Sequence, residues 1–262
     1  MILRPWTGQN KPPLGVQPNR AHSLRPDYAW LLNERNGRAV YDVVAGKIAT
    51  LSGGATWHPD GIDFDGASGG ISLPLPFAAN SCTLIARVRA DAAQARFIVT
   101  QIYNPPDALW WWFGTDTDPD NLQAFWNGSA YVYSNTPIPV GEWRNIAVVN
   151  DVSANKISFY MDGVADGGGA SSRTSAYAGL GWLGRNNAGT FYSDGQLGHF
   201  MWFQGANHTM ARELTAIPYQ WLAQPDLAWM WAGIEAGGML PFQRSLTDGG
   251  TVYPAMTGGM RA

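Results

Sequence analysis

A run of aromatic residues is the feature of this sequence best suited to ligand binding. Trp110-Trp-Trp-Phe113 is followed by Trp126 and Tyr131. Aromatic faces stack on sugar rings and also anchor protein interfaces. Consecutive strand residues point to opposite faces, so the first and third tryptophans share one face and the second shares the other with the phenylalanine. One set can fill a core, whereas the other lies under a ligand, a partner or the chain's own extensions. We predict that four residues line a ligand-binding surface: Trp110, Trp112, Trp126 and Tyr131.

An acidic segment follows the aromatic run. Asp116-Thr-Asp-Pro-Asp-Asn121 places three carboxylates at alternating positions, and such a segment can surround a hard cation such as calcium with oxygen ligands. An EF-hand loop has glycine at its sixth position and an acid at its twelfth, where this sequence has Asn121 and Asn127. The alternative is a solvated turn, since Asp and Asn hydrogen-bond to their own backbone. The candidate calcium ligands are Asp116, Asp118 and Asp120, and no other cofactor is predicted.

The residues that could catalyse hydrolysis are scattered. The glutamates are Glu34, Glu142, Glu213 and Glu235, whereas a two-carboxylate glycosidase needs a pair about 5–10 Å apart. The four histidines have no Gly-x-Ser-x-Gly motif nearby, and His199 alternates within an apolar strand, which favours a structural role. Aspartates that pair in space remain the route to a hydrolase. We predict no catalytic residues and a protein that is not an enzyme.

Composition excludes several classes of partner. The 262 residues carry 17 Lys and Arg against 20 Asp and Glu, a formal net charge of −3, without the basic patch of a nucleic-acid-binding protein. The single cysteine, Cys82, forms neither an internal disulfide nor a cysteine-rich zinc site. No segment approaches the ~20 apolar residues of a membrane span, and the N-terminus lacks the apolar run of a signal sequence. We expect synthesis in the cytoplasm and no membrane partner.

Turn residues and short apolar segments predict an all-β fold. The chain has 31 Gly and 17 Pro, and segments rich in aromatic and β-branched residues alternate with turns, as is typical of an antiparallel sandwich. Asp162-Gly163 predicts a tight turn after one of these segments. The predicted strands cover residues 81–90, 95–103, 108–114, 122–126, 130–134, 143–149, 156–162, 180–183 and 196–204.

The two ends of the chain have a different character. Five prolines within residues 1–26 predict an extended arm, because proline lacks the backbone donor of helices and central strands. A short helix is predicted over 209–216 with Thr209 as its cap, and a second over 227–240. The sequence after residue 246 is rich in glycine.

Several fragments, taken in order, match one known pattern. They are Trp30-Leu-Leu-Asn-Glu34, Ile62-Asp-Phe-Asp-Gly66, Gly141-Glu-Trp143 leading into Ile146-Ala-Val-Val149, Phe159-Tyr-Met-Asp-Gly163, Leu183-Gly-Arg185 and residues 195–203. Over residues 28–222 they resemble the laminin G-like, concanavalin A-like jelly roll.

The resemblance implies a two-sheet antiparallel jelly-roll sandwich that binds glycans or proteins at loop edges or on its concave sheet, sometimes with calcium. The hydrolase branch of that superfamily carries Glu-x-Asp-x-Glu or Glu-x-Asp-x-x-Glu on one strand, and this sequence has no such run. The fold hosts binding modules, enzymes and structural parts, so the site decides the function. The expected organisation is an arm over 1–26, the sandwich over 27–222 and a C-terminal extension over 223–262.

A second resemblance suggests a setting. Ile217-Pro-Tyr-Gln-Trp-Leu222 is similar to the segment that follows such domains in bacteriophage-encoded chains. Terminal arms of this composition are usually disordered unless they are bound, so neighbouring subunits are the expected partners. We therefore expect a homo-oligomeric, non-enzymatic structural protein of the virion: a capsid decoration, a head fibre, or a collar or tail component. The alternatives are a carbohydrate-binding module that adheres to surface glycans and, third, a glycoside hydrolase.

Overall fold

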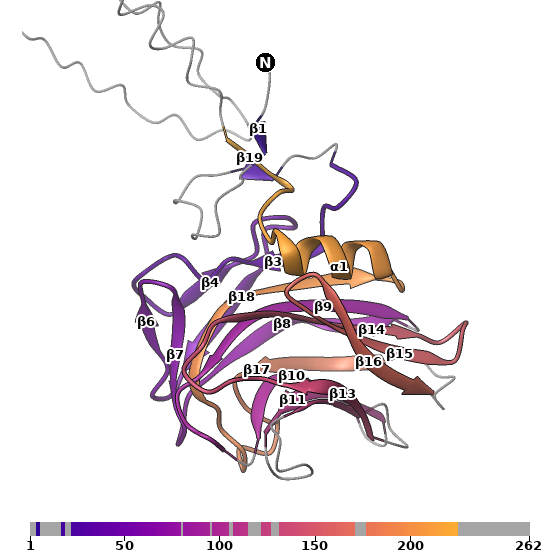
Figure 1. Ribbon diagram of the computed structural model, residues 1–262. Coiled ribbons are helices and arrows are strands. Elements are labelled where there is room, and N and C mark those ends of the chain that lie inside the picture. The colour runs from indigo at the N-terminus through magenta and orange to yellow at the C-terminus, as the bar shows by residue number, and fades with distance from the viewer. Residues whose placement is uncertain are drawn as a thin grey trace, which may run out of the picture. The chain divides into compact units, whose positions relative to one another are not determined.

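Sixteen antiparallel strands form one sheet, fifteen of them along a single hydrogen-bonded path, and the sheet folds back on itself into two facing layers (Figure 1). The computed structural model describes residues 4–5, 17–18, 22–79, 81–94, 96–104, 107–114, 122–126, 131–170 and 177–224. All of them belong to one unit, Leu3–Gln224. The predicted antiparallel sandwich is thereby confirmed.

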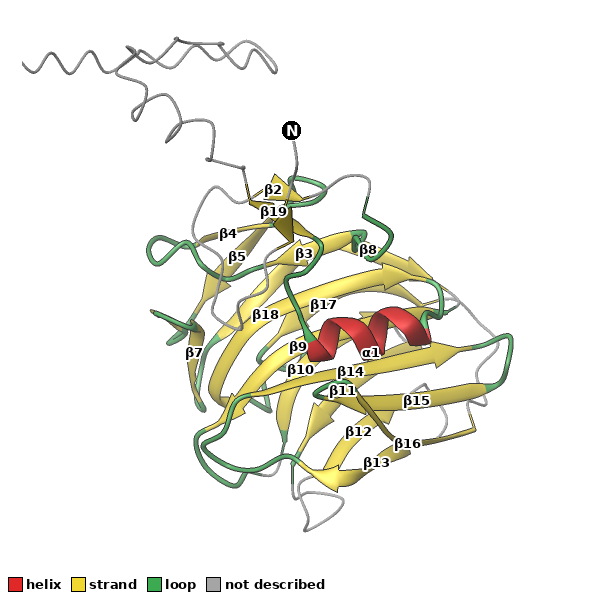
Figure 2. Cartoon of the chain, turned by 45° about the horizontal axis from the view of Figure 1, so that its top comes forward, coloured by secondary structure: helices red, strands yellow, loops and turns green. Residues whose placement is uncertain are grey.

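One layer, here called the helix-covered sheet, carries the single described helix on its outer face (Figure 2). The helix is α1 (His208–Ala216). In spatial order the strands are β6 (Thr56–His58), β7 (Gly61–Asp65), β18 (Asp194–Gln204), β9 (Cys82–Ala90), β14 (Arg144–Asp151), β15 (Lys156–Met161) and β16 (Val164–Ala170), and β3 (Tyr28–Trp30) also pairs with β18.

The other layer, here called the platform sheet, continues the path from β16. Its strands in spatial order are β13 (Tyr131–Pro137), β12 (Leu122–Trp126), β11 (Asp107–Phe113), β10 (Phe97–Asn104), β17 (Tyr177–Leu183), β8 (Gly70–Ala79), β5 (Ile48–Ser52) and β4 (Ala39–Tyr41). The two layers are joined at β13 and β16 through one residue pair, Ser134 and Gly167. A separate small sheet consists of β1 (Arg4–Pro5), β19 (Leu222–Gln224) and β2 (Gln17–Pro18).

Alternation along the strands divides the apolar residues between two cores. In β9, Leu84 and Val88 point between the layers, whereas Ile85 points outward and packs with Leu214 of α1 and with Trp221. Both faces of β9 are therefore buried, which explains why this strand is almost continuously apolar. The helix removes from water one face that an antiparallel sheet usually leaves exposed.

Turn chemistry matches the sequence at the β15–β16 hairpin. Asp162 and Gly163 have φ values of 49° and 87°, the left-handed conformation that a tight two-residue hairpin turn requires. A Cβ on Gly163 would lie 2.8 Å from the Cβ of Ala216, so α1 also needs the glycine. The predicted turn is confirmed.

The helix begins earlier than expected. Its N-cap is Asn207, whose side chain accepts a hydrogen bond from the backbone N of Met210 at 2.9 Å. The prediction of Thr209 as the cap was wrong, because Thr209 already lies within the helix. The helix predicted over 227–240 and the glycine-rich end lie outside the described residues. Across the described part of the chain, no helix has the length and apolarity to cross a bilayer.

Candidate functional site

Aromatic side chains form a cluster on the outer face of the platform sheet. Trp110 of β11 lies opposite Trp126 of β12, which lies opposite Tyr131 of β13. Directly opposed residues of antiparallel strands point to the same face, so the three side chains form a row across the sheet. Trp112 packs in the same cluster, while Trp111 lies in the core between the layers. The predicted division of the tryptophans between two faces is confirmed.

The four predicted site residues form one chain of ring contacts. The ring of Tyr131 lies 5.2 Å from that of Trp112 and 4.5 Å from that of Trp126, measured between centroids. Trp110 and Trp112 meet edge to face at 6.1 Å. Tyr133 adds a further ring, 6.4 Å from Tyr131.

These residues differ in how much of each ring a ligand could reach. Trp112 is only 1% exposed, whereas Tyr131 is 40% exposed and Trp110, Trp126 and Tyr133 are half-buried. Trp112 therefore packs against the other rings of the cluster but is not accessible to a ligand. We call the accessible set, Trp110, Trp126, Tyr131 and Tyr133, the aromatic platform. That its members bind a ligand stays a prediction.

Two further residues border the platform. The guanidinium carbon of Arg96 lies 5.8 Å from the ring centroid of Trp110, 5.4 Å from that of Trp112 and 4.5 Å from that of Phe191. These distances are within the ~6 Å range of cation–π attraction. Arg96 and Phe191 come from other parts of the chain, so no local spacing in the sequence could have associated them with the tryptophans.

The segment that carries Phe191 is held by two asparagines. Asn186 Oδ1 accepts hydrogen bonds from the backbone N of Thr190 at 2.8 Å and of Phe191 at 3.1 Å. The backbone N of Asn187 donates to Oε1 of Gln101, a residue directly opposite Trp110 in β10. This segment therefore lies on the same face of the sheet as the platform and forms a wall beside it.

The candidate metal ligands cannot be placed. Asp116, Asp118 and Asp120 lie outside the described residues, so the calcium site stays a prediction. Within the described ranges, no group of three or more His, Cys, Asp or Glu side chains could hold a metal ion.

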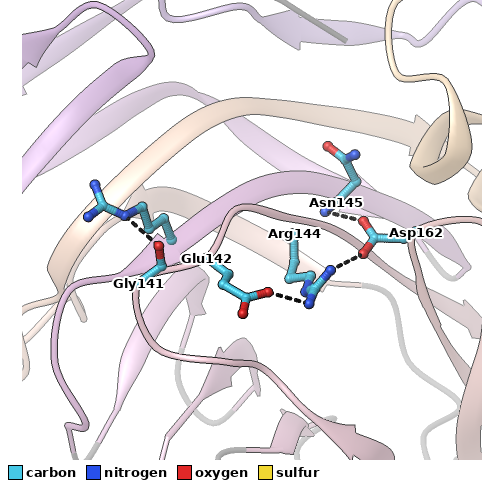
Figure 3. Close-up of polar contacts among 6 residues, drawn as sticks. Gly141, Glu142, Arg144, Asn145 and Asp162 are labelled. Atoms are coloured by element: carbon cyan, nitrogen blue, oxygen red, sulfur yellow. Dashed lines mark hydrogen bonds and ion pairs between the residues drawn. The ribbon is translucent and has the colours of Figure 1, made fainter.

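The glutamate of the Gly-Glu-Trp fragment joins an ion-pair cluster (Figure 3). Arg144 Nη2 lies 2.5 Å from Glu142 Oε2, and Arg144 Nη1 lies 3.2 Å from Asp162 Oδ2. The second oxygen of Asp162 accepts a hydrogen bond from the backbone N of Asn145 at 2.9 Å (Figure 3). The cluster connects the start of β14 to the β15–β16 turn.

The structural role predicted for His199 agrees with its surroundings. His199 is fully buried in β18, and its Nδ1 lies 3.1 Å from Tyr219 Oη. Burial raises the pKa of Tyr219 to about 12. Its phenol is therefore neutral and able to hydrogen-bond with the imidazole under all ordinary conditions.

Comparison with known families identifies the class of protein. The family model described as the concanavalin A-like lectin/glucanases superfamily matches residues 65–208, more than half of the chain. The chain belongs to this superfamily, as the laminin G-like resemblance implied. A search of curated proteins found no match.

Solved structures agree with this assignment. Domain 4 of AbnA, a GH43 extracellular arabinanase from Geobacillus stearothermophilus, in complex with arabinotriose, has a TM-score of 0.59 at 17% identity and covers 73% of this chain and 98% of that chain. Trypanosoma rangeli sialidase in complex with the inhibitor DANA has a TM-score of 0.56 at 17% identity and covers 72% of this chain. The chain spans only 32% of the sialidase. At this identity the likeness shows the fold.

These relatives correct one prediction. The protein was expected not to be an enzyme, but the similar structures come from an arabinanase and from sialidases, so the fold is compatible with a glycoside hydrolase. The expectation rested on the lack of an acidic run on one strand. That reasoning fails because catalytic carboxylates can come from different strands, provided that they converge in space. Neither the family model nor the similar solved structures support a bacteriophage origin or a virion role.

Proposed function

We propose that the protein binds carbohydrate through the aromatic platform. The observation that carries this proposal is the row of rings on the outer face of the platform sheet, where Tyr131 is 40% exposed and its neighbours are half-buried. An exposed apolar cluster rimmed by polar residues marks a binding surface. Aromatic rings fixed by strands provide a flat apolar surface at little conformational cost, which suits the C–H face of a sugar.

The surroundings supply polar partners beside the rings. Arg96 lies over the edge of the cluster, and Asn187 is exposed on the wall segment. Saccharides present apolar faces and hydroxyl edges together, and a site for them combines a hydrophobic surface with a few placed polar groups. The arabinanase domain of the same fold was solved in complex with arabinotriose, which makes arabino-oligosaccharides a natural first probe.

The proposal is tested by isothermal titration calorimetry with a panel of arabino-, xylo-, cello- and galacturono-oligosaccharides. Replacing a ring that a ligand buries by alanine typically costs about 2 kcal/mol, roughly a thirtyfold loss of affinity. We expect this loss for Trp126→Ala and Tyr131→Ala. The matched control is Tyr41→Ala, because Tyr41 is 49% exposed on β4 of the same sheet, outside the platform.

Absence of binding to every member of the panel would overturn the proposal. Binding that Trp126→Ala and Tyr131→Ala leave unchanged would overturn it as well. Mass analysis of the oligosaccharides after incubation reports at the same time whether any of them is cleaved.

We also propose neighbouring subunits as partners and the virion as the location of the protein. A homo-oligomer held by the terminal arms, within a virion, rests on segments that lie largely outside the described residues. Limited proteolysis of the isolated chain tests this idea, since arms that need neighbouring subunits should be removed rapidly.

A further inference from the structure

A polar groove lies where the platform sheet meets the helix-covered sheet. Strands β13 and β16 run beside each other in both views, but they pair only through Ser134 and Gly167 (Figures 1 and 2). Where they diverge, a shallow, open groove of about 450 Å³ lies on the surface. Its lining residues are Asn135, Ala154, Asn155, Lys156, Gly167, Gly168, Gly169 and Ala170.

Strand β13 links this groove to the aromatic platform. Tyr131, Tyr133 and Asn135 occupy alternate positions of β13, so they lie on the same face of the strand. Their burial agrees, because Val132 and Ser134 between them are buried. The amide group of Asn135 lies against Gly167, close enough that a Cβ on that glycine would meet Asn135 Oδ1 at 2.7 Å. A ligand lying on Tyr133 therefore reaches the groove by passing over Asn135.

The lining of the groove favours a polar ligand with negative charge. It contains two asparagines and one lysine, and none of its residues is acidic. Lys156 is exposed and no ion pair to it occurs among the described residues. Asp151 of β14 is directly opposite Lys156, but its carboxylate accepts hydrogen bonds from Ser153 Oγ and the backbone N of Ala154, at 2.6 and 3.0 Å. The glycine backbone also leaves peptide groups open to approach.

The distances define the length of the ligand. From Trp110 on β11 to Lys156 on β15 the surface crosses four strand spacings, about 19 Å at roughly 4.8 Å each. One sugar unit of an extended chain is close to one strand spacing in length. A single sugar therefore occupies only part of this surface, whereas a chain of several units can contact the rings and the groove together.

We infer that the ligand of the platform is an extended acidic oligosaccharide, whose chain crosses β11, β12 and β13 and places a carboxylated unit in the groove beside Lys156. This inference rests on the proposed function, because it names the class of ligand for the same surface. The rings bind the sugar faces along the chain, and Lys156 and Asn135 bind the polar groups at its end.

The test compares two probe series by calorimetry: galacturono-oligosaccharides and neutral arabino-oligosaccharides, each from the disaccharide to the hexasaccharide. We expect affinity to rise with length up to about the tetrasaccharide and to be higher for the acidic series. Lys156→Ala should weaken binding of the acidic series about fivefold, the effect of one exposed charge pair, and leave the neutral series unchanged. Lys156→Arg should retain binding, and Lys47→Ala, at an exposed lysine outside the groove, is the control.

The outcomes distinguish a failure of this inference from a failure of the proposed function. If saccharides bind and Tyr131→Ala abolishes binding, but Lys156→Ala and chain length have no effect, the groove is not part of the site and the inference fails alone. If neither series binds, both the proposed function and the inference fail. If Lys156→Ala weakens the binding of acidic and neutral chains equally, Lys156 does not bind a carboxylated sugar unit and the inference fails.

Discussion

The carboxylate of Asp65 shows how one side chain can hold a turn. Its Oδ1 accepts hydrogen bonds from the backbone N of Ala67, Ser68 and Gly69 at 3.0, 2.8 and 3.1 Å, and its Oδ2 accepts one from Ser68 Oγ at 2.8 Å. Burial alone would raise the pKa of Asp65, but these hydrogen bonds outweigh it and hold the pKa at about 2. This aspartate therefore has a structural role in the turn that follows β7.

Removing this carboxylate should destabilise the protein in a pH-dependent way. Asp65→Ala is expected to lower the free energy of unfolding by about 1–2 kcal/mol at pH 7, because three backbone donors lose their acceptor. A pKa lowered from 3.8 to about 2 stabilises the fold above pH 3.8, and this contribution is lost as the pH falls toward 2. Urea denaturation of the wild type and of Asp65→Ala should show that the difference between their free energies of unfolding becomes smaller from pH 7 to pH 2.

The control for this experiment is Asp60→Ala. The carboxylate of Asp60 lies 4.0 Å from His58 Nδ1, too far for a hydrogen bond, so the change should stay within about 0.5 kcal/mol. A difference between wild type and Asp65→Ala that is equally large at pH 7 and pH 2 would contradict the argument.

At the scale of the element, α1 depends on a residue before its first turn. Asn207 accepts the hydrogen bond from Met210 N with its side chain, and its own backbone N donates to Thr83 Oγ1 at 2.8 Å. The cap thus fixes where the helix begins and attaches this point to β9. The helix needs that attachment because its buried residues, Ala211 and Leu214, must face the sheet.

Two substitutions distinguish the observed cap from the one expected from sequence. Asn207→Ala should lower the free energy of unfolding by about 1 kcal/mol, the usual loss on removing a cap side chain. Thr209→Ala should change it by less than about 0.5 kcal/mol, because Thr209 is exposed in the first turn. Chemical denaturation measures both; equal losses in the two variants would argue against Asn207 as the cap.

At the scale of the whole molecule, the two sheets are joined near a buried acid. Asp166 of β16 is 5% exposed, beside the single β13–β16 residue pair. Burial raises the pKa of Asp166, and hydrogen bonds from Thr136, Asn135 and Ser134 of β13 oppose this effect only in part. The junction between the layers therefore contains a carboxylate whose ionised form is unfavourable.

The pH dependence of stability should report this junction. For an acid whose pKa is raised on folding, stability is highest below the unfolded-state pKa, near 3.8, and falls as the pH rises through the folded-state value. Asparagine does not ionise, so Asp166→Asn should not lose stability in this way. The free energy of unfolding of the variant, minus that of the wild type, should therefore increase from pH 3 to pH 7.

Asp151→Asn is the matched control with the opposite sign. Hydrogen bonds from Ser153 Oγ and Ala154 N lower the pKa of Asp151, so this variant should lose stability relative to wild type over the same pH range. Thermal unfolding at several pH values measures both variants. Parallel curves for Asp166→Asn and wild type would show that the buried acid does not contribute.

Local patterns in the sequence were sufficient for much of the sandwich. The strand predicted over 122–126 matches β12, and the Asp162-Gly163 turn follows from the positive φ that only a few residues adopt easily. The alternation in Trp110-Trp-Trp-Phe113 correctly divided these side chains between core and outer face. Each of these features depends on residues that are close along the chain, and that is the range over which spacing carries information.

Strands β8 and β16 were not among the predicted strands, because their composition argues against them. Strand β8 contains Pro74 and Pro76, and its register with β17 shifts between Gly181, opposite Leu73, and Leu180, opposite Pro76. An irregularity of this kind accommodates prolines in a sheet. Strand β16 contains three consecutive glycines and is held by β15 over most of its length. In both cases neighbouring strands override a poor local propensity.

Local sequence patterns specify the class of fold and the residues of the aromatic row, whereas tertiary contacts determine which of those residues a ligand can reach. Register between β11, β12 and β13 buried Trp112 and left Tyr131 exposed. The same packing brought Arg96 and Phe191 to the platform and opened the groove at Asn135 and Lys156. The physical reason is that hydrophobic periodicity specifies which face a side chain takes, whereas contacts between distant segments depend on the register and packing of whole strands.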